Sequence, residues 1–272
     1  MDITFIGGGN MAIALIGGLV ERGASPHAFR VVEPVPAQRE RLAGLFPGAR
    51  VYADVATEAV AGTGLVVLAV KPQQMREAAR VVAPHLKDEL VLSIAAGIRL
   101  VDLGRWLGGD ARLARCMPNT PALIGLGVTG LYARPEVAPA QRAHAQAVLE
   151  AVGEVIWVDD EALLDPVTAV SGSGPAYVFY LIEALERAAR EVGLDAAAAR
   201  RLALGTFRGA AELAARSSEP PATLRERVTS KGGTTERALA SMRADKVDEA
   251  IVRAVRAANE RAKALGDELG KD

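Results

Sequence analysis

The sequence predicts an α/β domain with a Rossmann-like, doubly wound parallel sheet, followed by an all-α domain. Up to about residue 160, short apolar runs alternate with longer helical patterns, which is typical of buried parallel strands joined by helices. Beyond that point the β-branched clusters stop, and helical patterns continue to the C-terminus. We therefore predict one domain over residues 1–160 and a helical domain over residues 161–272.

The apolar runs give the expected strands in order. They lie at residues 4–6, 30–32, 65–70, 90–94, 111–115, 128–133 and 154–158. A helix that starts after Pro139 separates the last two strands. Ligands of open α/β sheets bind at the carboxyl ends of the strands, so the loops that follow these runs are the first place to look for a site.

The composition excludes several classes of function. The 272 residues are enough for two domains with real cores, and the formal net charge of −1 without a long Lys/Arg block argues against nucleic acid as a partner. No apolar stretch approaches the roughly 20 residues of a membrane span, so we expect no membrane segment. The single cysteine, Cys116, excludes an internal disulfide and a thiolate metal cluster and favours a reducing, cytoplasmic compartment. We expect no metal.

A glycine turn follows the first strand and opens a helix. Its residues Gly7, Gly9 and Ala12 match the G-x-G-x-x-[GA] spacing. The first glycine permits the tight turn, the second lets a pyrophosphate approach the backbone, and the small third residue lets the helix pack on the strand. A glycine-rich turn of another α/β protein gives the same pattern, but the position at the first strand favours a dinucleotide site.

The end of the second strand bears on the choice of cofactor. Glu33 lies where an acidic residue hydrogen-bonds the ribose 2′-OH and favours NADH. Arg39 and Arg41 follow nearby and could accept the 2′-phosphate of NADPH instead, while solvated surface charges are an equally good interpretation of all three residues. The pattern leaves both NADPH and NADH open.

Rigid loops of small residues follow later strands. Ala69-Val70-Lys71-Pro72 and Ser93-Ile94-Ala95-Ala96-Gly97 each end a strand, and Met117-Pro118-Asn119-Thr120-Pro121 has two prolines around Asn119. Each loop is weak support when taken alone. Together they predict one shared crevice at the carboxyl edge of the sheet.

The helical half carries two further features. The turn at residues 228–239, Val-Thr-Ser-Lys-Gly-Gly-Thr-Thr-Glu-Arg-Ala-Leu, opens a helix, and its peptide N–H groups suit an anion. A helix opened by Gly174-Pro175 is apolar on nearly every face, and we interpret Ser171 and Ser173 as its cap residues. So much apolar surface in a small domain predicts burial against a second subunit in a homodimer.

In combination these segments closely resemble the pyrroline-5-carboxylate reductase family, over almost the whole chain. The resemblance is carried by the two glycine turns, the three strand-end loops, and Ser171-Gly172-Ser173-Gly174-Pro175-Ala176-Tyr177. It implies a Rossmann domain with a helical dimerisation domain, often assembled into decameric rings of dimers. It also implies hydride delivery from NADPH or NADH to the C=N carbon of 1-pyrroline-5-carboxylate, which gives L-proline.

The resemblance also implies the roles of individual residues. Thr235 would be the catalytic hydroxyl that hydrogen-bonds the ring nitrogen, in a turn that meets the substrate from the partner subunit's helical domain. The substrate-binding residues would be Ser230, Lys231, Gly232, Gly233, Thr234 and Thr235. The cofactor-binding residues would be Ile6, Gly7, Gly8, Gly9, Asn10, Met11, Ala69, Val70, Lys71, Pro72, Ala95, Ala96 and Gly97, with Asn119 close to the nicotinamide.

The chain departs from the family pattern at three positions. Lys231 stands where the family usually has proline, Ala56 replaces an asparagine of the adenosine pocket, and Gly64 replaces a frequent aspartate. Ala56 bears on the NADPH/NADH choice, and Lys231 loosens the turn while adding a cation. None of the three touches Gly-Gly-Thr-Thr.

Two competing interpretations make different demands on the sequence. A β-hydroxyacid dehydrogenase needs a catalytic lysine on the long helix of its second domain, yet residues 176–216 contain no lysine. A non-catalytic redox sensor would bind the dinucleotide without turnover and would have no need of a second anion site. The Gly-Gly-Thr-Thr turn therefore favours the enzyme.

Overall fold

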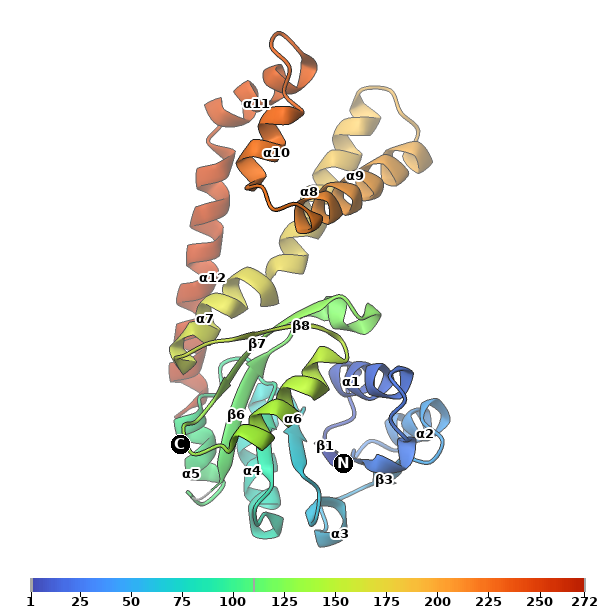
Figure 1. The fold of residues 1–272 in the computed structure, drawn as a ribbon, viewed down its shortest axis with the longest axis vertical. Helices are drawn as coiled ribbons and strands as arrows, with labels where there is room; N and C mark the ends of the chain where they lie inside the picture. Colours follow the sequence, from blue (N-terminus) through green and yellow to red (C-terminus); the bar gives the residue numbers. More distant parts are fainter. Residues whose placement is uncertain (1, 110, 272) are drawn as a thin grey trace. The chain divides into compact units, whose positions relative to one another are not determined.

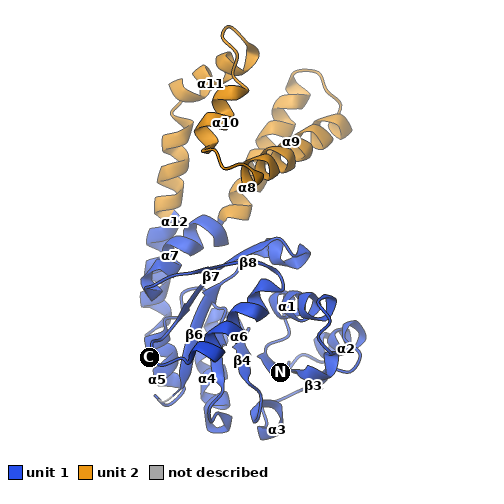
Figure 2. Cartoon of the chain, viewed as in Figure 1, with its two compact units in different colours: residues 1–173, 258–272 blue, residues 174–257 orange. Residues whose placement is uncertain are grey.

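The computed structural model describes residues 2–109 and 111–271. The chain forms two compact units, coloured separately in Figure 2. The sheet unit comprises Met1–Ser173 and Ala258–Asp272, and the helical unit comprises Gly174–Ala257. The compact units therefore meet at other residues than 160. The functional boundary that we expect after residue 160 stays a prediction.

The sheet unit is built on an eight-stranded sheet in the order β3-β2-β1-β4-β5-β6-β7-β8, as assigned in the described residues. The order reverses between β1 and β4, which both pair with their neighbours in parallel. The strands are β1 (Ile3–Ile6), β2 (Phe29–Val32), β3 (Arg50–Tyr52), β4 (Leu65–Leu68), β5 (Leu90–Ser93), β6 (Arg112–Met117), β7 (Gly127–Ala133) and β8 (Gly153–Trp157). All the predicted strands are confirmed, and the fold class is as expected.

Two features of the sheet differ from the prediction. β7 runs antiparallel to β6, with Cys116 opposite Leu131. The link between them holds only the short turn η4 (Thr120–Ile124), whereas a parallel crossover needs about a dozen residues or more. The edge strand β3 was not predicted, because its three residues are too few to show a pattern.

Helices cover both faces of the sheet, as Figure 1 shows. One buried cluster joins Phe5 and Val67 to α1 and α6, and the other joins Ile6 and Val66 to α4 and α5. Alternate residues of each strand therefore point into opposite cores. The helices of this unit are α1 (Asn10–Glu21), α2 (Pro36–Leu45), α3 (Thr57–Val60), α4 (Met75–Val82), α5 (Leu100–Trp106), α6 (Pro139–Glu150) and α7 (Leu164–Val167).

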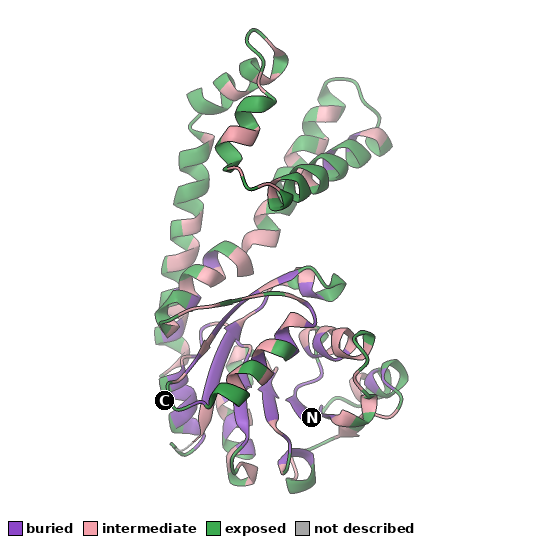
Figure 3. Cartoon of the chain, viewed as in Figure 1, coloured by how far each residue is buried: buried purple, intermediate pink, exposed green. Residues whose placement is uncertain are grey.

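The helical unit holds few buried side chains. Its helices are α8 (Gly174–Glu191), α9 (Ala196–Arg216), α10 (Pro221–Arg227), α11 (Thr234–Ala244) and the first part of α12 (Val247–Leu269). α8 is largely exposed in Figure 3, with Phe179 60% and Tyr180 72% accessible. α12 crosses the boundary at Ala257, so its second part belongs to the sheet unit.

No helix in the described part of the chain is both long enough and apolar enough to cross a membrane.

Candidate active site

The first glycine turn is fixed at the end of β1 between two neighbouring strands. The Gly7 amide donates to the Val32 carbonyl at 2.8 Å, and the Ala69 amide donates to the Ile6 carbonyl at 2.8 Å. Gly7 has a φ of 99°, and a Cβ there would lie 2.8 Å from the Ala69 carbonyl oxygen. Only glycine meets both conditions. The turn is therefore in direct contact with the loop at residues 69–72, as the shared crevice requires.

The next two glycines differ sharply from each other. Gly8 is buried, its amide donates to Glu33 Oε2 at 2.9 Å, and its carbonyl accepts from the Gln38 side chain. Gly9 is exposed, and a Cβ added to it would meet nothing within 4 Å. Gly8 thus anchors the turn, whereas Gly9 leaves its outer surface open to a ligand.

α1 begins directly after this open glycine. Gly9 is the N-cap of α1, and no side chain caps the helix. The amides of Asn10 and Met11 lie in its first turn, where an N–H group has no helix carbonyl to bind. Ala12 is fully buried and packs the helix onto the sheet. A helix N-terminus with an uncovered glycine suits a phosphate, so these residues fit the pyrophosphate of a dinucleotide.

Glu33 has two backbone partners, and its contact with the ribose stays a prediction. Its carboxylate accepts from the Gly8 amide through Oε2 and from the Val35 amide through Oε1, both at 2.9 Å. Its side chain is buried. Arg39 lies over the same segment and donates to the carbonyls of Glu33 and Pro34 at 3.0 and 2.7 Å. The Glu33 side chain therefore holds the glycine turn to the end of β2 through the Gly8 amide. The Arg39 guanidinium lies beside the same end of the strand.

The other strand-end loops lie at the same edge of the sheet. β4 and β5 are adjacent and parallel, so residues 69–72 and 95–97 follow their carboxyl ends side by side. Lys71 is exposed and precedes the short turn η2 (Pro72–Gln74). Gly97 is buried with a φ of 74°. The structure thus places the expected cofactor loops along one edge.

Asn119 is tied into the protein at both ends of its side-chain amide. Nδ2 donates to the carbonyl and the hydroxyl oxygens of Ser171, each at 3.2 Å, and Oδ1 accepts from the Val128 amide at 2.9 Å. The Ser171 hydroxyl donates to the Val128 carbonyl at 3.3 Å. Ser171 lies in the π-helical turn η6 (Thr168–Gly172), so it is a partner of Asn119 rather than a cap of α8.

A buried cation in β6 was missed by sequence reasoning. Arg115 is 2% exposed, and its Nη1 lies 3.0 Å from Glu161 Oε1, with Asp165 Oδ1 3.9 Å from Nη2. Glu161 Oε1 also accepts from the Leu100 amide at 2.7 Å, at the start of α5. The network joins β6, α5 and the segment after β8. Its only sequence signal was an arginine inside an apolar strand.

The second glycine turn lies in the helical unit, at the start of α11. Gly232 has a φ of 76°, and its amide donates to Glu236 Oε2 at 2.7 Å. The Gly233 amide donates to the Ser230 carbonyl at 3.0 Å, and Gly233 is the N-cap of α11 without a side-chain cap. In the described part of the chain, the leading amides of Thr234 and Thr235 have no acceptor.

These amides are available to an anion, and the anion site expected from the sequence stays a prediction. Thr235 is half-buried, whereas Lys231 and Thr234 are exposed. The carboxylate of Glu236 was not foreseen at this place, although a glutamate two residues into a helix is a common partner of the preceding turn. It occupies the Gly232 amide, one of the donors of the turn.

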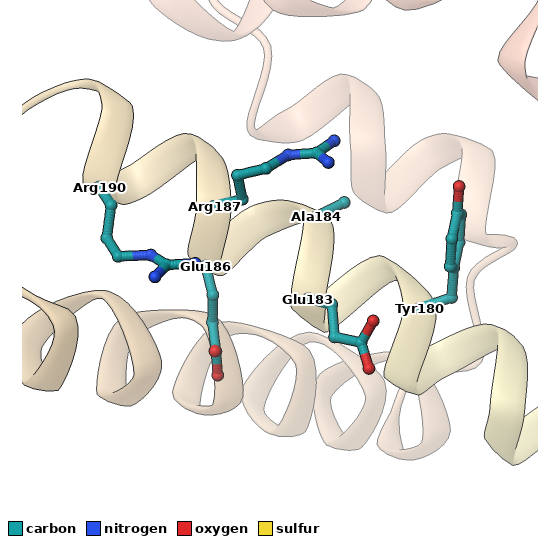
Figure 4. A pocket seen from close by; sticks show the side chains of 6 residues that line it. All are labelled: Tyr180, Glu183, Ala184, Glu186, Arg187 and Arg190. Atoms are coloured by element: carbon teal, nitrogen blue, oxygen red, sulfur yellow. The ribbon is translucent and has the colours of Figure 1, made fainter.

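The hollow in Figure 4 lies apart from these motifs. It is lined by side chains of α8 alone, and none of them is a predicted site residue: Tyr180, Glu183, Ala184, Glu186, Arg187 and Arg190. Charged groups dominate its lining. It has no nucleophile or helix N-terminus that would make it a centre of chemistry.

Comparisons with known proteins agree with this geometry. The family model described as pyrroline-5-carboxylate reductase dimerisation matches residues 161–265, and the one described as NADP oxidoreductase coenzyme F420-dependent matches residues 2–97. The chain is 47% identical to the pyrroline-5-carboxylate reductase of Pseudomonas aeruginosa over 270 residues, which covers 99% of this chain and 98% of the relative.

Solved structures extend the similarity to three dimensions. The pyrroline-5-carboxylate reductase of Coxiella burnetii has a TM-score of 0.91 at 37% identity, covering 97% of this chain and 98% of that one. The pyrroline carboxylate reductase of Plasmodium falciparum, solved with NADP bound, has a TM-score of 0.86 at 26% identity, with 98% of each chain covered. On sequence and fold together, the chain belongs to the pyrroline-5-carboxylate reductase family.

Proposed function

We propose that residues 230–235 bind the substrate of the family's reaction and that the carboxyl edge of the sheet binds NAD(P)H. The reaction reduces the C=N bond of 1-pyrroline-5-carboxylate and gives L-proline. One observation carries the proposal: the chain has a second helix N-terminus after a glycine turn, with the leading amides of Thr234 and Thr235 still without acceptors among the described residues. The first glycine turn suits the pyrophosphate, so the second is available to the substrate carboxylate.

The chain's own residues would then act by binding and orientation. NAD(P)H supplies the hydride when bound. The amides at the start of α11 hold the substrate carboxylate, and the Thr235 hydroxyl donates a hydrogen bond to the ring nitrogen. As the hydride reaches the neighbouring carbon, the electron pair of the C=N π bond moves onto the nitrogen, which takes a proton from the Thr235 hydroxyl while water returns a proton to that oxygen; a fixed donor at the nitrogen stabilises the developing negative charge.

The cofactor side of the site is proposed residue by residue. Asn10 and Met11 would donate amides to the pyrophosphate beside the open Gly9. Residues 69–72 and 95–97 would line the same edge, with Asn119 near the nicotinamide. Glu33 would support the turn from beneath, because both of its carboxylate oxygens already accept amide hydrogens.

The assembly is proposed from the helical unit. α8 exposes Phe179 and Tyr180 together with Val178, Leu181 and Leu185, which is far more apolar surface than a helix normally leaves in water. A homodimer formed through residues 161–272 would cover it, and decameric rings of dimers are the larger assembly that we propose. Light scattering on the purified protein tests both; a stable monomer would contradict them.

Two further proposals concern the domain boundary and the cellular compartment. The functional boundary after residue 160 separates nucleotide binding from dimerisation and substrate binding, even though compactness divides the chain elsewhere. A cytoplasmic, reducing compartment is supported by Cys116, which is a free, buried thiol.

The direct test is to mix the purified protein with 1-pyrroline-5-carboxylate and follow the oxidation of NADPH and NADH in separate reactions. Turnover with formation of L-proline is expected. Cofactor binding without turnover would favour the sensor interpretation. A dehydrogenase of β-hydroxyacids would instead oxidise its substrate with NAD(P)⁺, a reaction for which residues 176–216 provide no lysine.

A further inference from the structure

The loop between β5 and α5 is held by a part of the chain far away in sequence. We propose that residues 258–270, here called the docking segment, position residues 95–97 for cofactor binding, and that Arg99 is the positioning residue. The docking segment and the loop both belong to the sheet unit. The proposal rests on the proposed contact between residues 95–97 and NAD(P)H.

Arg99 makes the polar half of this attachment. Its Nη1 lies 2.7 Å from Asp267 Oδ1, and its Nη2 donates to the Lys263 carbonyl at 3.2 Å. The guanidinium lies directly on the helix backbone at Gly266, where a Cβ would be 2.8 Å from Arg99 Nε. Gly266 therefore leaves the space that the arginine occupies.

The apolar half lies two residues earlier in the loop. A Cβ on Gly97 would be 3.1 Å from Leu269 Cδ1 and 3.2 Å from Leu265 Cβ, so the glycine backbone is in contact with the docking segment. Leu269 packs against the buried cluster that contains Ala95 and Ile98. Gly97 also has a φ of 74°, which disfavours any side chain there.

The end of the loop is fastened separately. The Leu100 amide donates to Glu161 Oε1 at 2.7 Å, and this carboxylate is paired with buried Arg115. One turn further on, Arg105 Nη2 donates to the Gly270 carbonyl at 2.8 Å. The loop is thus fixed by β5 at one end and by α5 at the other. The docking segment contacts the middle of the loop at Gly97.

Such an attachment affects ligand binding more than folding. Arg99 and Asp267 are 37% and 65% exposed, and exposed ion pairs contribute little to the stability of a fold. A loop that is already ordered, however, loses less conformational entropy when a ligand binds. Releasing residues 95–97 should therefore weaken the cofactor complex while the sheet unit stays folded.

The test uses the full-length enzyme and measures the Kd of NADPH by fluorescence titration, together with kcat and the unfolding midpoint. Arg99→Ala should raise the Kd by about three- to tenfold, with kcat at saturating cofactor within about twofold of the wild type. Arg99→Lys should recover part of the loss, because an ammonium keeps the charge but not the two-pronged geometry. Arg261→Ala is the matched control, since this arginine pairs with Glu268 on the same helix.

Gly266→Ala separates positioning from stability. Alanine is the better helix former, so the unfolding midpoint should stay or rise, while the displaced guanidinium raises the Kd of NADPH. If Arg99 only stabilised the fold, weaker binding of NADPH would come with a lower unfolding midpoint. Wild-type Kd values for both Arg99→Ala and Gly266→Ala would overturn the proposal.

Ala96→Val distinguishes this failure from failure of the proposed site. Ala96 is half-buried in the loop itself, and added bulk there should obstruct the cofactor directly. If Ala96→Val weakens NADPH binding while the Arg99 and Gly266 variants do not, the docking segment has no positioning role although the loop contacts the cofactor. If Ala96→Val also binds normally, residues 95–97 lie outside the cofactor site and the proposed site itself is wrong there.

Discussion

The Gly8 amide lies 2.9 Å from Glu33 Oε2, and this hydrogen bond joins the first glycine turn to the end of the second strand. The other carboxylate oxygen accepts from the Val35 amide. The residue that sequence patterns assign to the ribose therefore also holds the backbone, and these two roles of Glu33 differ in their consequences for the binding of NADH and NADPH.

Glu33→Gln should weaken the binding of both cofactors by a similar factor. Glutamine offers one acceptor where two amides now donate, so the fold should lose on the order of 1.5–3 kcal/mol of unfolding free energy as well. Denaturant unfolding and titrations with NADH and NADPH are the measurements, and Glu40→Gln, on the exposed side of α2, is the control. If Glu33→Gln weakens the binding of NADH alone, Glu33 hydrogen-bonds the ribose 2′-OH.

Thr235→Val should lower kcat about a hundredfold, which corresponds to roughly 3 kcal/mol of lost transition-state stabilisation. Valine keeps the shape of threonine and removes the hydroxyl that we place on the ring nitrogen. Thr235→Ser should retain most of the activity.

Stability distinguishes this role of Thr235 from helix capping. The N-cap of α11 is Gly233, and no side chain caps the helix, so the unfolding free energy of Thr235→Val should change by less than about 0.5 kcal/mol. A destabilised variant with unchanged turnover would show that the threonine serves the helix and not the reaction.

Glu236→Ala should lower the KM for 1-pyrroline-5-carboxylate by about two- to fivefold, with kcat little changed. The carboxylate accepts from the Gly232 amide at 2.7 Å, so at the proposed site it would compete with the substrate's own carboxylate. Glu226→Ala removes an exposed charge from α10 and is the matched control. A higher KM would mean that Glu236 shapes the turn, and Glu236→Gln would then restore it.

Cys116 should resist thiol reagents in the folded enzyme. Burial raises the pKa of its thiol, which disfavours the reactive thiolate, and the side chain is fully enclosed. Reaction with Ellman's reagent should be slower than in denaturant by about a hundredfold or more. The chain has one cysteine, so the denatured protein should release one equivalent of thionitrobenzoate from the reagent. Rapid labelling of the native protein would show that β6 opens easily.

The sequence was sufficient for the fold because most strands of the sheet interior are runs of mainly apolar residues, such as β1, β4 and β5. It was insufficient where a pattern is short or where direction matters, as in β3 and β7. The reversal of β7 had a signal in the short link after Met117, which no crossover helix could fill.

The candidate site was predictable where chemistry depends on the backbone. Gly7 occupies the place that its spacing implied, because its positive φ and its contact with the Ala69 backbone both require glycine, and Gly9 follows it with its surface open. Side-chain pairings were beyond reach: Glu33 with Gly8, Asn119 with Ser171 and Arg115 with Glu161 join segments that only the folded chain brings together. Helical periodicity likewise gave no sign of which core the end of α12 would join.

The split of α12 between the two units bears on how the protein is made. Translation delivers residues 1–173, then the whole helical unit, and only afterwards residues 258–270, which complete the packing around Gly97. On the ribosome the nucleotide-binding sheet therefore waits for a piece that is made only after the whole helical unit, unlike a domain that closes as soon as its own stretch is synthesised. A gene fragment that stops at residue 173 would encode the sheet without this piece.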